Sequence, residues 1–156
     1  MTMPHQKPHR SKQDYSTPPE VLAAVKNRLG IREFALDVAA TEENKVCPAF
    51  CKDGLLEPWS TRGWNWCNPP FGDIEPWVMK AREEIFRGAQ TAVLVPASVG
   101  SNWWAIWVDG RAHVWFMNGR IRFVGATGPY PKDTAILLFT SVARGGYEIW
   151  DWKGDV

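Results

Sequence analysis

The tetrapeptide Asn68-Pro69-Pro70-Phe71 constrains this 156-residue chain more than any other feature of its sequence. It follows residues 63–67, which predict a strand, and it precedes a helical pattern that starts near Asp73. Proline has a fixed φ and no N–H group, so two consecutive prolines end the strand and hold a stiff loop. Open α/β sheets build their sites at the carboxyl ends of strands, so this loop is the first candidate for a functional site.

The same loop suits methyl transfer to a weakly nucleophilic amine. An amino group on an aromatic base has its lone pair delocalised into the ring, and two carbonyl acceptors on its hydrogens would return electron density to nitrogen. The Asn68 side chain and the Pro69 backbone supply two such acceptors, and Pro70 stiffens them. Phe71 would stack on the base, a contact worth about 1–3 kcal/mol. The alternative is an ordinary turn, because Asn-Pro-Pro is also a turn sequence.

The composition is that of one globular domain. Hydrophobic residues make up 45% of the chain and charged residues 22%, which is normal for a protein that buries a core. The length is too short for two ordinary domains. Residues 1–13 are basic and free of aromatic side chains, so they predict a disordered tail before a single domain over residues 14–156. A formal net charge of +1 does not exclude nucleic acid as a partner, since it can conceal a local basic face.

The positions of the cysteines in the sequence predict neither a metal site nor a catalytic nucleophile. Cys47, Cys51 and Cys67 are odd in number and follow no secretion signal, so we expect free thiols. The Cys47–Cys51 spacing is loose for zinc and no histidine pair completes it, so no metal is expected. Cytosine carbon-5 methylation uses a Pro-Cys pair, whereas Cys67 follows Trp66 in a predicted strand and is expected to be buried. The sequence has no apolar run of membrane-spanning length and no signal peptide, so a cytoplasmic protein is expected.

Strand and helix patterns alternate at first, and strands dominate later. Thr17, Pro18 and Glu20 have the form of a capping box, which predicts a helix that ends at Gly30. A second helix is expected from near Asp73 to Gly88 and a short one over residues 103–108, with strands at 34–40, 63–67, 91–96, 112–117, 121–124, 134–140 and 146–152. This order predicts an α/β sheet with antiparallel strands at its C-terminal end.

Two acidic residues lie at expected strand ends before the loop. Asp37 belongs to the apolar run over residues 34–40, and Asp53 opens a turn after a second short strand. A methyl donor with a ribose and an adenine needs carboxylates for its ammonium or hydroxyls and for its ring amine. Asp37 fits the first role and Asp53 the second. Taken singly, each aspartate is better explained as a turn or cap residue.

Together these segments resemble the phage-type DNA N(6)-adenine methyltransferases, the Dam-like family of phages and prophages. The resemblance covers roughly residues 14–142. It rests on residues 16–20, 36–40 with Asn44, 53–55, 66–71 with Trp77, 94–97, 103–104 and 119–123. It implies a Rossmann-like methyltransferase fold, S-adenosyl-L-methionine as the methyl donor and adenine in DNA as the acceptor.

The resemblance also implies roles for single residues on the donor side. Asp37 would lie at the methionine or ribose end of the donor and Asp53 near its adenine, while Thr17 and Pro18 would line the methionine side. Ala39 opens the segment Ala39-Ala40-Thr41, which stands where the family has a glycine-rich turn. Small side chains there still permit close approach of the donor.

On the acceptor side, the resemblance implies that residues 68–71 hold an adenine flipped out of the duplex. The chain has no long target-recognition region, so strict sequence selectivity is not expected. Two alternatives stay open. One is a methyltransferase that acts on an RNA base amine or a protein glutamine, because the loop suits any planar amine or amide. The other is a catalytically inactive nucleic-acid-binding module that uses aromatic side chains as stacking platforms.

Overall fold

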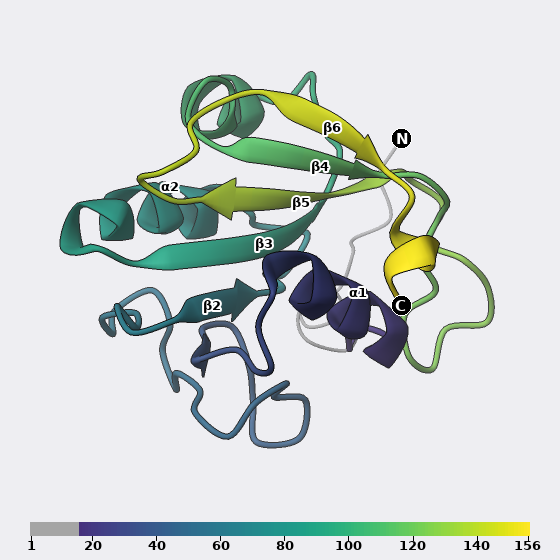
Figure 1. Cartoon of the computed structure of the whole chain (residues 1–156), viewed down its shortest axis with the longest axis horizontal. Helices are drawn as coiled ribbons and strands as arrows, with labels where there is room; N and C mark the ends of the chain where they lie inside the picture. Colours follow the sequence, from purple (N-terminus) through teal and green to yellow (C-terminus); the bar gives the residue numbers. More distant parts are fainter. Residues whose placement is uncertain (1–15) are drawn as a thin grey trace, which may run out of the picture.

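A computed structural model describes residues 16–156, so the tail predicted over residues 1–13 lies outside the described part of the chain. The described residues form a mixed α/β fold around a six-stranded sheet with the order β1-β2-β3-β5-β4-β6 (Figure 1). The strands are β1 (Leu36–Asp37), β2 (Trp64–Cys67), β3 (Gln90–Pro96), β4 (His113–Met117), β5 (Thr134–Phe139) and β6 (Tyr147–Trp150). The helical elements are α1 (Pro19–Leu29), α2 (Glu75–Glu84), the 3-10 turns η2 (Ile85–Arg87) and η4 (Trp152–Asp155), and the π-helical η3 (Trp104–Val108).

Most strands of the sheet run in one direction. β1, β2 and β3 pair in parallel, β5 is antiparallel to both β3 and β4, and β4 pairs in parallel with β6. The prediction of antiparallel strands at the end of the sheet is therefore only partly right, because β5 alone is reversed. The carboxyl ends of β1 to β4 meet the amino end of β5 at one edge, which we call the carboxyl edge. There the Ala97 N–H donates to the Asp133 carbonyl at 2.8 Å.

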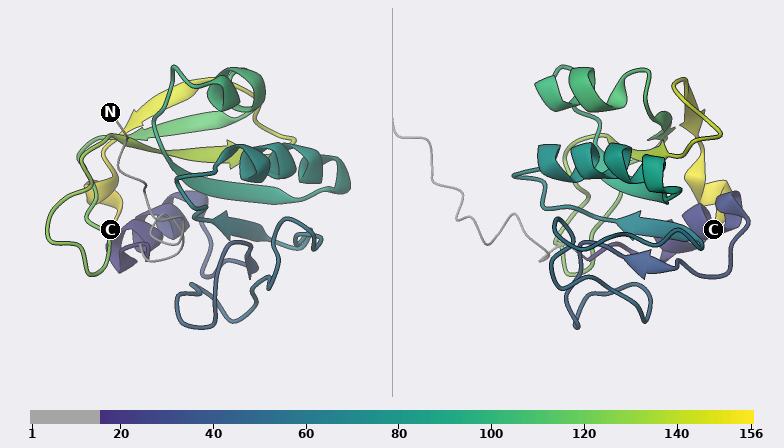
Figure 2. Two further views of the ribbon diagram at one scale, coloured as in Figure 1. Left: turned by 180° about the vertical axis from the view of Figure 1, so that it is seen from behind. Right: turned by 90° about the vertical axis from the view of Figure 1, so that its left-hand side faces the viewer.

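Helices cover both faces of the sheet (Figure 2). Successive residues of β3 alternate between the two faces, so Val93 and Val95 pack under α2 and η3, while Ala92 and Leu94 pack under α1 and η4. β3 and β5 are buried along almost their whole length. A strand with both faces covered is apolar throughout, which explains why these two were readily predicted from the sequence.

The two glycines that were predicted to end helices do so, but the capping box that was predicted at the start of the first helix is absent. α1 ends at Gly30 and η2 at Gly88, with φ values of 71° and 94° that favour glycine. The N-cap of α1 is Pro18, which makes no side-chain cap hydrogen bond, so the predicted capping box is wrong. The Thr17 hydroxyl instead accepts a hydrogen bond from the distant residue Asn68.

Two predicted strands are shorter or absent. The run over residues 34–40 gives only the two residues of β1, because the following chain turns back and Phe50 bridges Asp37. Residues 121–124 form no strand, and Val124 makes only an isolated bridge to Ser16. The chain curls there instead, with the Tyr130 N–H donating to the Ile121 carbonyl at 2.7 Å. The sequence in this region is β-like, but it has no neighbouring strand to pair with.

Candidate active site

A small pocket lies at the carboxyl edge of the sheet, where β1 and β2 end beside the start of α1. The residues that line it are Ser16, Thr17, Asp37, Ala39, Asn44, Val46, Trp66 and Asn68. Four of these were predicted as site residues from the sequence, and they come from three separate segments. Pro18, also predicted, is buried next to Thr17 as the N-cap of α1.

Asp37 supplies the carboxylate of the pocket. It is the last residue of β1, and only 3% of its surface is exposed. Its Oδ1 accepts a hydrogen bond from the Ala39 N–H at 3.3 Å, and its Oδ2 accepts one from the Val46 N–H at 3.1 Å. Burial raises the pKa of Asp37 to about 6, and these two hydrogen bonds oppose the rise. The carboxylate thus holds the turn after β1 and is mainly ionised at neutral pH. Among the pocket residues from the described part of the chain, none has a cationic side chain.

Asn68 brings the Asn-Pro-Pro-Phe loop to the same pocket. It directly follows β2, and its Nδ2 donates to the Thr17 Oγ1 at 3.1 Å. This bond ties the loop to the segment that precedes α1. Pro69 is buried, and the Pro70 carbonyl accepts a hydrogen bond from the Asp73 N–H at 3.1 Å, which turns the loop into α2. The loop is therefore held at both ends.

Phe71 is half-buried in a cluster of three aromatic rings. Its ring centroid lies 5.8 Å from that of Phe123 and 5.5 Å from that of Tyr130, both in edge-on contacts. Phe123 and Tyr130 also meet edge-on, at 5.6 Å. Both partners belong to the segment between β4 and β5, which was not assigned to the site from the sequence. Two aromatic residues in a Gly- and Pro-rich loop were the available signal, since such side chains rarely stay in solvent.

Asp53 does not line the pocket. Its side chain is exposed, its N–H donates to the Glu57 carboxylate at 2.6 Å, and its carbonyl accepts from the Leu56 and Glu57 N–H groups. The next residue, Gly54, lies against the end of β1, where a Cβ atom would come within 1.7 Å of the Val38 carbonyl oxygen. Asp53 thus lies near the end of β1, through its neighbour Gly54, but it is not one of the residues that line the pocket.

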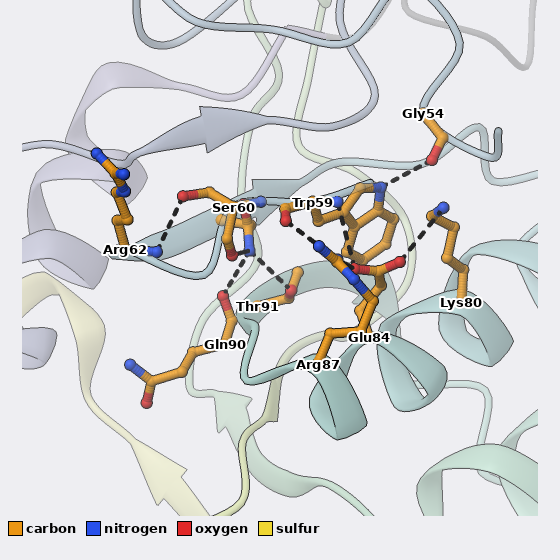
Figure 3. Close-up of polar contacts among 10 residues, drawn as sticks. Gly54, Trp59, Ser60, Arg62, Lys80, Glu84, Arg87, Gln90 and Thr91 are labelled. Atoms are coloured by element: carbon orange, nitrogen blue, oxygen red, sulfur yellow. Dashed lines mark hydrogen bonds and ion pairs between the residues drawn. The ribbon is translucent and has the colours of Figure 1, made fainter. Parts of the chain in front are cut away.

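A buried polar network fastens the segment after Gly54 to α2 (Figure 3). The Trp59 indole donates to the Gly54 carbonyl at 2.7 Å, and the Trp59 N–H donates to the Glu84 carboxylate at 3.3 Å. Glu84 also pairs with Lys80 at 3.6 Å and with Arg87. This buried carboxylate has two cationic partners and a backbone donor, so its role is to hold the segment in place.

Trp66 is a pocket residue that sequence reasoning missed. It lies on β2 in register with Asp37 and is fully buried. Its indole Nε1 is the one buried side-chain nitrogen or oxygen atom of residues 16–156 with no hydrogen-bond partner. Such an atom normally has a partner, and no sequence pattern reveals the exception.

All three cysteines are free, as expected from the sequence, and Cys67 is buried as predicted; Cys47 and Cys51 are buried as well. Burial raises the pKa of Cys47 and of Cys51 to about 11 and holds the pKa of Cys67 well above its ordinary value, so these thiols stay protonated. Residues 16–156 contain no group of three or more His, Cys, Asp or Glu side chains placed to hold a metal ion. Within the same residues, every helix is too short or too polar to cross a membrane.

Comparisons with known proteins point in one direction. The sequence profile of a family described as DNA N-6-adenine-methyltransferase (Dam) matches residues 5–138. The DNA N-6-adenine-methyltransferase of Escherichia phage T1 is 33% identical to this chain over 135 residues. That alignment covers 73% of this chain and 55% of the phage protein, so the chain spans about half the length of this relative. No solved structure matches the chain.

Proposed function

The chain belongs to the DNA N-6-adenine-methyltransferase (Dam) family, and from this premise we propose that it transfers a methyl group from S-adenosyl-L-methionine to the 6-amino group of adenine in DNA. The observation that carries the proposal is the pocket that joins Thr17, Asp37 and Ala39 to Asn68 at the carboxyl edge. The three parallel strands with helices on both faces are consistent with a Rossmann-like arrangement, in which ligands bind at this edge.

The polar groups of the pocket suit a cationic donor. Among the lining residues that the structure describes, Asp37 supplies the one carboxylate, hydroxyl and amide groups surround it, and there is no Lys, Arg or His. Asp37 would accept charge-assisted hydrogen bonds from the donor's ammonium or ribose hydroxyls. Thr17, Pro18 and Ala39 would line the methionine side, and Asp53 is proposed to lie near the donor's adenine. When bound, S-adenosyl-L-methionine supplies an electrophilic methyl group.

The Asn-Pro-Pro-Phe loop would hold the acceptor. The Oδ1 of Asn68 and the backbone carbonyl of Pro69 accept hydrogen bonds from the 6-amino group, which makes its nitrogen a better nucleophile. Thr17 orients Asn68 by accepting from its Nδ2 at 3.1 Å. Adenine must leave the base stack to reach this loop, and Phe71 would stack on the flipped base. Catalysis then consists mainly of positioning the amine in line with the methyl group. As the nitrogen–carbon bond forms, the bond between the methyl group and the donor's sulfur would break, the neutral thioether would leave, and the amine would release one proton to solvent water.

The test is transfer of a labelled methyl group to DNA by the protein and by Asn68→Ala. The variant is expected to lose about a hundredfold or more in rate, because it lacks one preorganised acceptor at the reacting nitrogen. Binding of S-adenosyl-L-methionine, measured by calorimetry, should change little. Asn27→Ala is the matched control, since Asn27 lies on α1 and donates to the Asp155 carbonyl instead.

The outcomes also separate the alternatives. Label in RNA or in protein glutamine instead of DNA would reassign the acceptor while keeping the donor site. A protein that binds DNA but neither binds S-adenosyl-L-methionine nor transfers methyl groups would be a nucleic-acid-binding module, and the proposed function would be wrong.

A further inference from the structure

The segment between β4 and β5, residues 118–133, concentrates positive charge. We call it the basic loop. It carries three cationic side chains, Arg120, Arg122 and Lys132, against the single carboxylate of Asp133, and all four residues are exposed. The whole chain has 18 Lys and Arg residues and 17 Asp and Glu residues, so this loop is far more basic than the chain as a whole. An excess of positive charge on a single exposed loop favours a polyanionic partner.

The basic loop lies at the carboxyl edge of the sheet (Figure 1), and the residues that line the pocket lie at this edge too. It leaves the carboxyl end of β4 and returns to the amino end of β5. The Val124 N–H donates to the carbonyl of Ser16 at 3.2 Å, and Ser16 lines the pocket. A polyanion bound to the loop would therefore run past the opening of the proposed acceptor site.

Contacts within the loop and with η4 hold the shape of the loop. The Arg122 Nε donates to the Ala126 carbonyl at 3.0 Å, and the Trp152 indole donates to the Gly119 carbonyl at 3.2 Å. Phe123 and Tyr130 pack edge-on against Phe71 of the Asn-Pro-Pro-Phe loop, so the basic loop and the proposed base-holding loop share one aromatic cluster. Whatever the cationic side chains bind is thereby placed in a fixed relation to Asn68 and Phe71.

We propose that the basic loop binds the phosphate backbone of duplex DNA next to the flipped adenine, with Arg122 and Lys132 on the phosphates. The proposal rests on the proposed function, because it names the surface that brings this acceptor to the pocket. Arg120 lies 3.6 Å from Asp133 and shares its charge with that carboxylate. Phosphate contacts set position without reading sequence.

The test compares the salt dependence of DNA affinity for charge variants of the full chain. Arg122→Gln/Lys132→Gln should lower the affinity for a 20-base-pair duplex at least about tenfold near 0.1 M salt, because each phosphate contact contributes a slope of about 0.9 in log affinity against log salt. The slope should flatten by about 2. A second variant, Arg120→Gln/Lys132→Gln, keeps the Arg122–Ala126 hydrogen bond and loses one proposed phosphate contact, that of Lys132, so it should flatten the slope by about 1.

Arg62→Gln/Arg144→Gln is the matched control, with the same loss of two exposed charges. Arg62 precedes β2 and Arg144 precedes β6, so both lie at the opposite edge of the sheet. This control should keep the parent slope, and all variants should keep the parent affinity for S-adenosyl-L-methionine, which checks that they remain folded.

The outcomes distinguish this inference from the proposed function. If the parent methylates DNA but the loop variants have the same slope as the parent, or the control pair flattens it equally, the basic loop does not bind phosphates and the proposed function stands. If the parent neither binds nor methylates DNA, the proposed function fails, and the inference fails with it.

Discussion

The Asp37 carboxylate accepts two backbone hydrogen bonds and yet has a pKa of about 6, because the cost of burying its charge is larger than the gain from its donors. Ionisation therefore occurs just below neutral pH. If Asp37 binds a cationic group of S-adenosyl-L-methionine, affinity should fall as the pH drops through 6, by up to about tenfold per pH unit. Calorimetric titrations from pH 5 to 8 measure this. Asp37→Asn should bind more weakly at pH 7.5 and show no such dependence, and parallel curves for the two proteins would contradict the role.

The ligand-free protein should respond to pH in the opposite direction. The pKa of Asp37 is higher in the folded state than the value of 3.8 expected for an unfolded chain, so the folded state binds the proton more tightly. The contribution of Asp37 to the free energy of unfolding is therefore fully present below pH 4, and it is lost as the pH rises through 6. The difference is on the order of 2–3 kcal/mol. Asp37→Asn should remove this component of the pH dependence, which urea unfolding at pH 4.5 and pH 7 would detect.

Trp59, Trp66 and Trp150 have at most 2% of their surface exposed, and they differ in the state of the indole N–H. Trp59 donates to the Gly54 carbonyl at 2.7 Å and Trp150 to the Asp155 carboxylate at 2.6 Å, whereas Trp66 has no partner among residues 16–156. Trp66→Phe removes an N–H whose burial is unfavourable, while Trp150→Phe breaks a hydrogen bond. Trp66→Phe should therefore lower the free energy of unfolding by about 1–3 kcal/mol less than Trp150→Phe does. Equal losses in urea titrations would show that the Trp66 N–H is satisfied in solution.

Close packing between elements fixes the turn that follows β1. Gly54 touches Val38 so closely that any Cβ atom would overlap its carbonyl oxygen, at 1.7 Å, and would also meet the Trp77 ring at 2.8 Å. Gly54→Ala should destabilise the protein by about 3 kcal/mol or more, because backbone rather than a flexible side chain must move. Gly100→Ala is the control, since a Cβ there has no neighbour within 4 Å. Thermal unfolding of both variants checks this, and similar melting temperatures would mean that the 54–60 segment can shift freely.

The elements that the sequence predicted well are those whose signals are local. Periodic apolar residues with a glycine stop located α1 and α2, and continuous apolar runs located β3 and β5. The extent of β1 and the loop at residues 121–124 were predicted wrongly, because pairing depends on which strand lies alongside. A β-like sequence without a neighbour stays a loop.

The same distinction applies to the site. Strand-end arguments placed Asp37 and Asn68 at one edge, and the structure brings both into one pocket. The Thr17–Asn68 hydrogen bond joins residues 51 positions apart, and Phe123 meets Phe71 across a similar separation. These contacts are set by the packing of α1 and the basic loop at the carboxyl edge. No local pattern encodes them.

At the scale of the whole molecule, the C-terminal segment closes one face of the sheet (Figure 2). Trp152 of η4 is 4% exposed and belongs to the hydrophobic cluster shared by α1 and the sheet. Its indole donates to the Gly119 carbonyl at 3.2 Å, and the Asp155 carbonyl accepts from Asn27 of α1 at 2.7 Å. The last described residues thus join the first helix to the base of the basic loop, so the molecule is expected to unfold as one unit.

Trp152→Ala tests this closure. Removing a buried tryptophan deletes its packing and leaves a cavity, so the free energy of unfolding should fall by about 3–5 kcal/mol. A small domain has only about 5–15 kcal/mol in total, so the variant should be marginally stable yet unfold in a single transition. The control is Lys153→Ala, at an exposed neighbouring position. It should change the free energy of unfolding by less than about 0.5 kcal/mol. Urea unfolding followed by tryptophan fluorescence and by far-ultraviolet circular dichroism measures both variants. A small early fluorescence change in Trp152→Ala, followed by a main transition at the parent's midpoint, would instead show that η4 detaches without loosening α1 or the sheet.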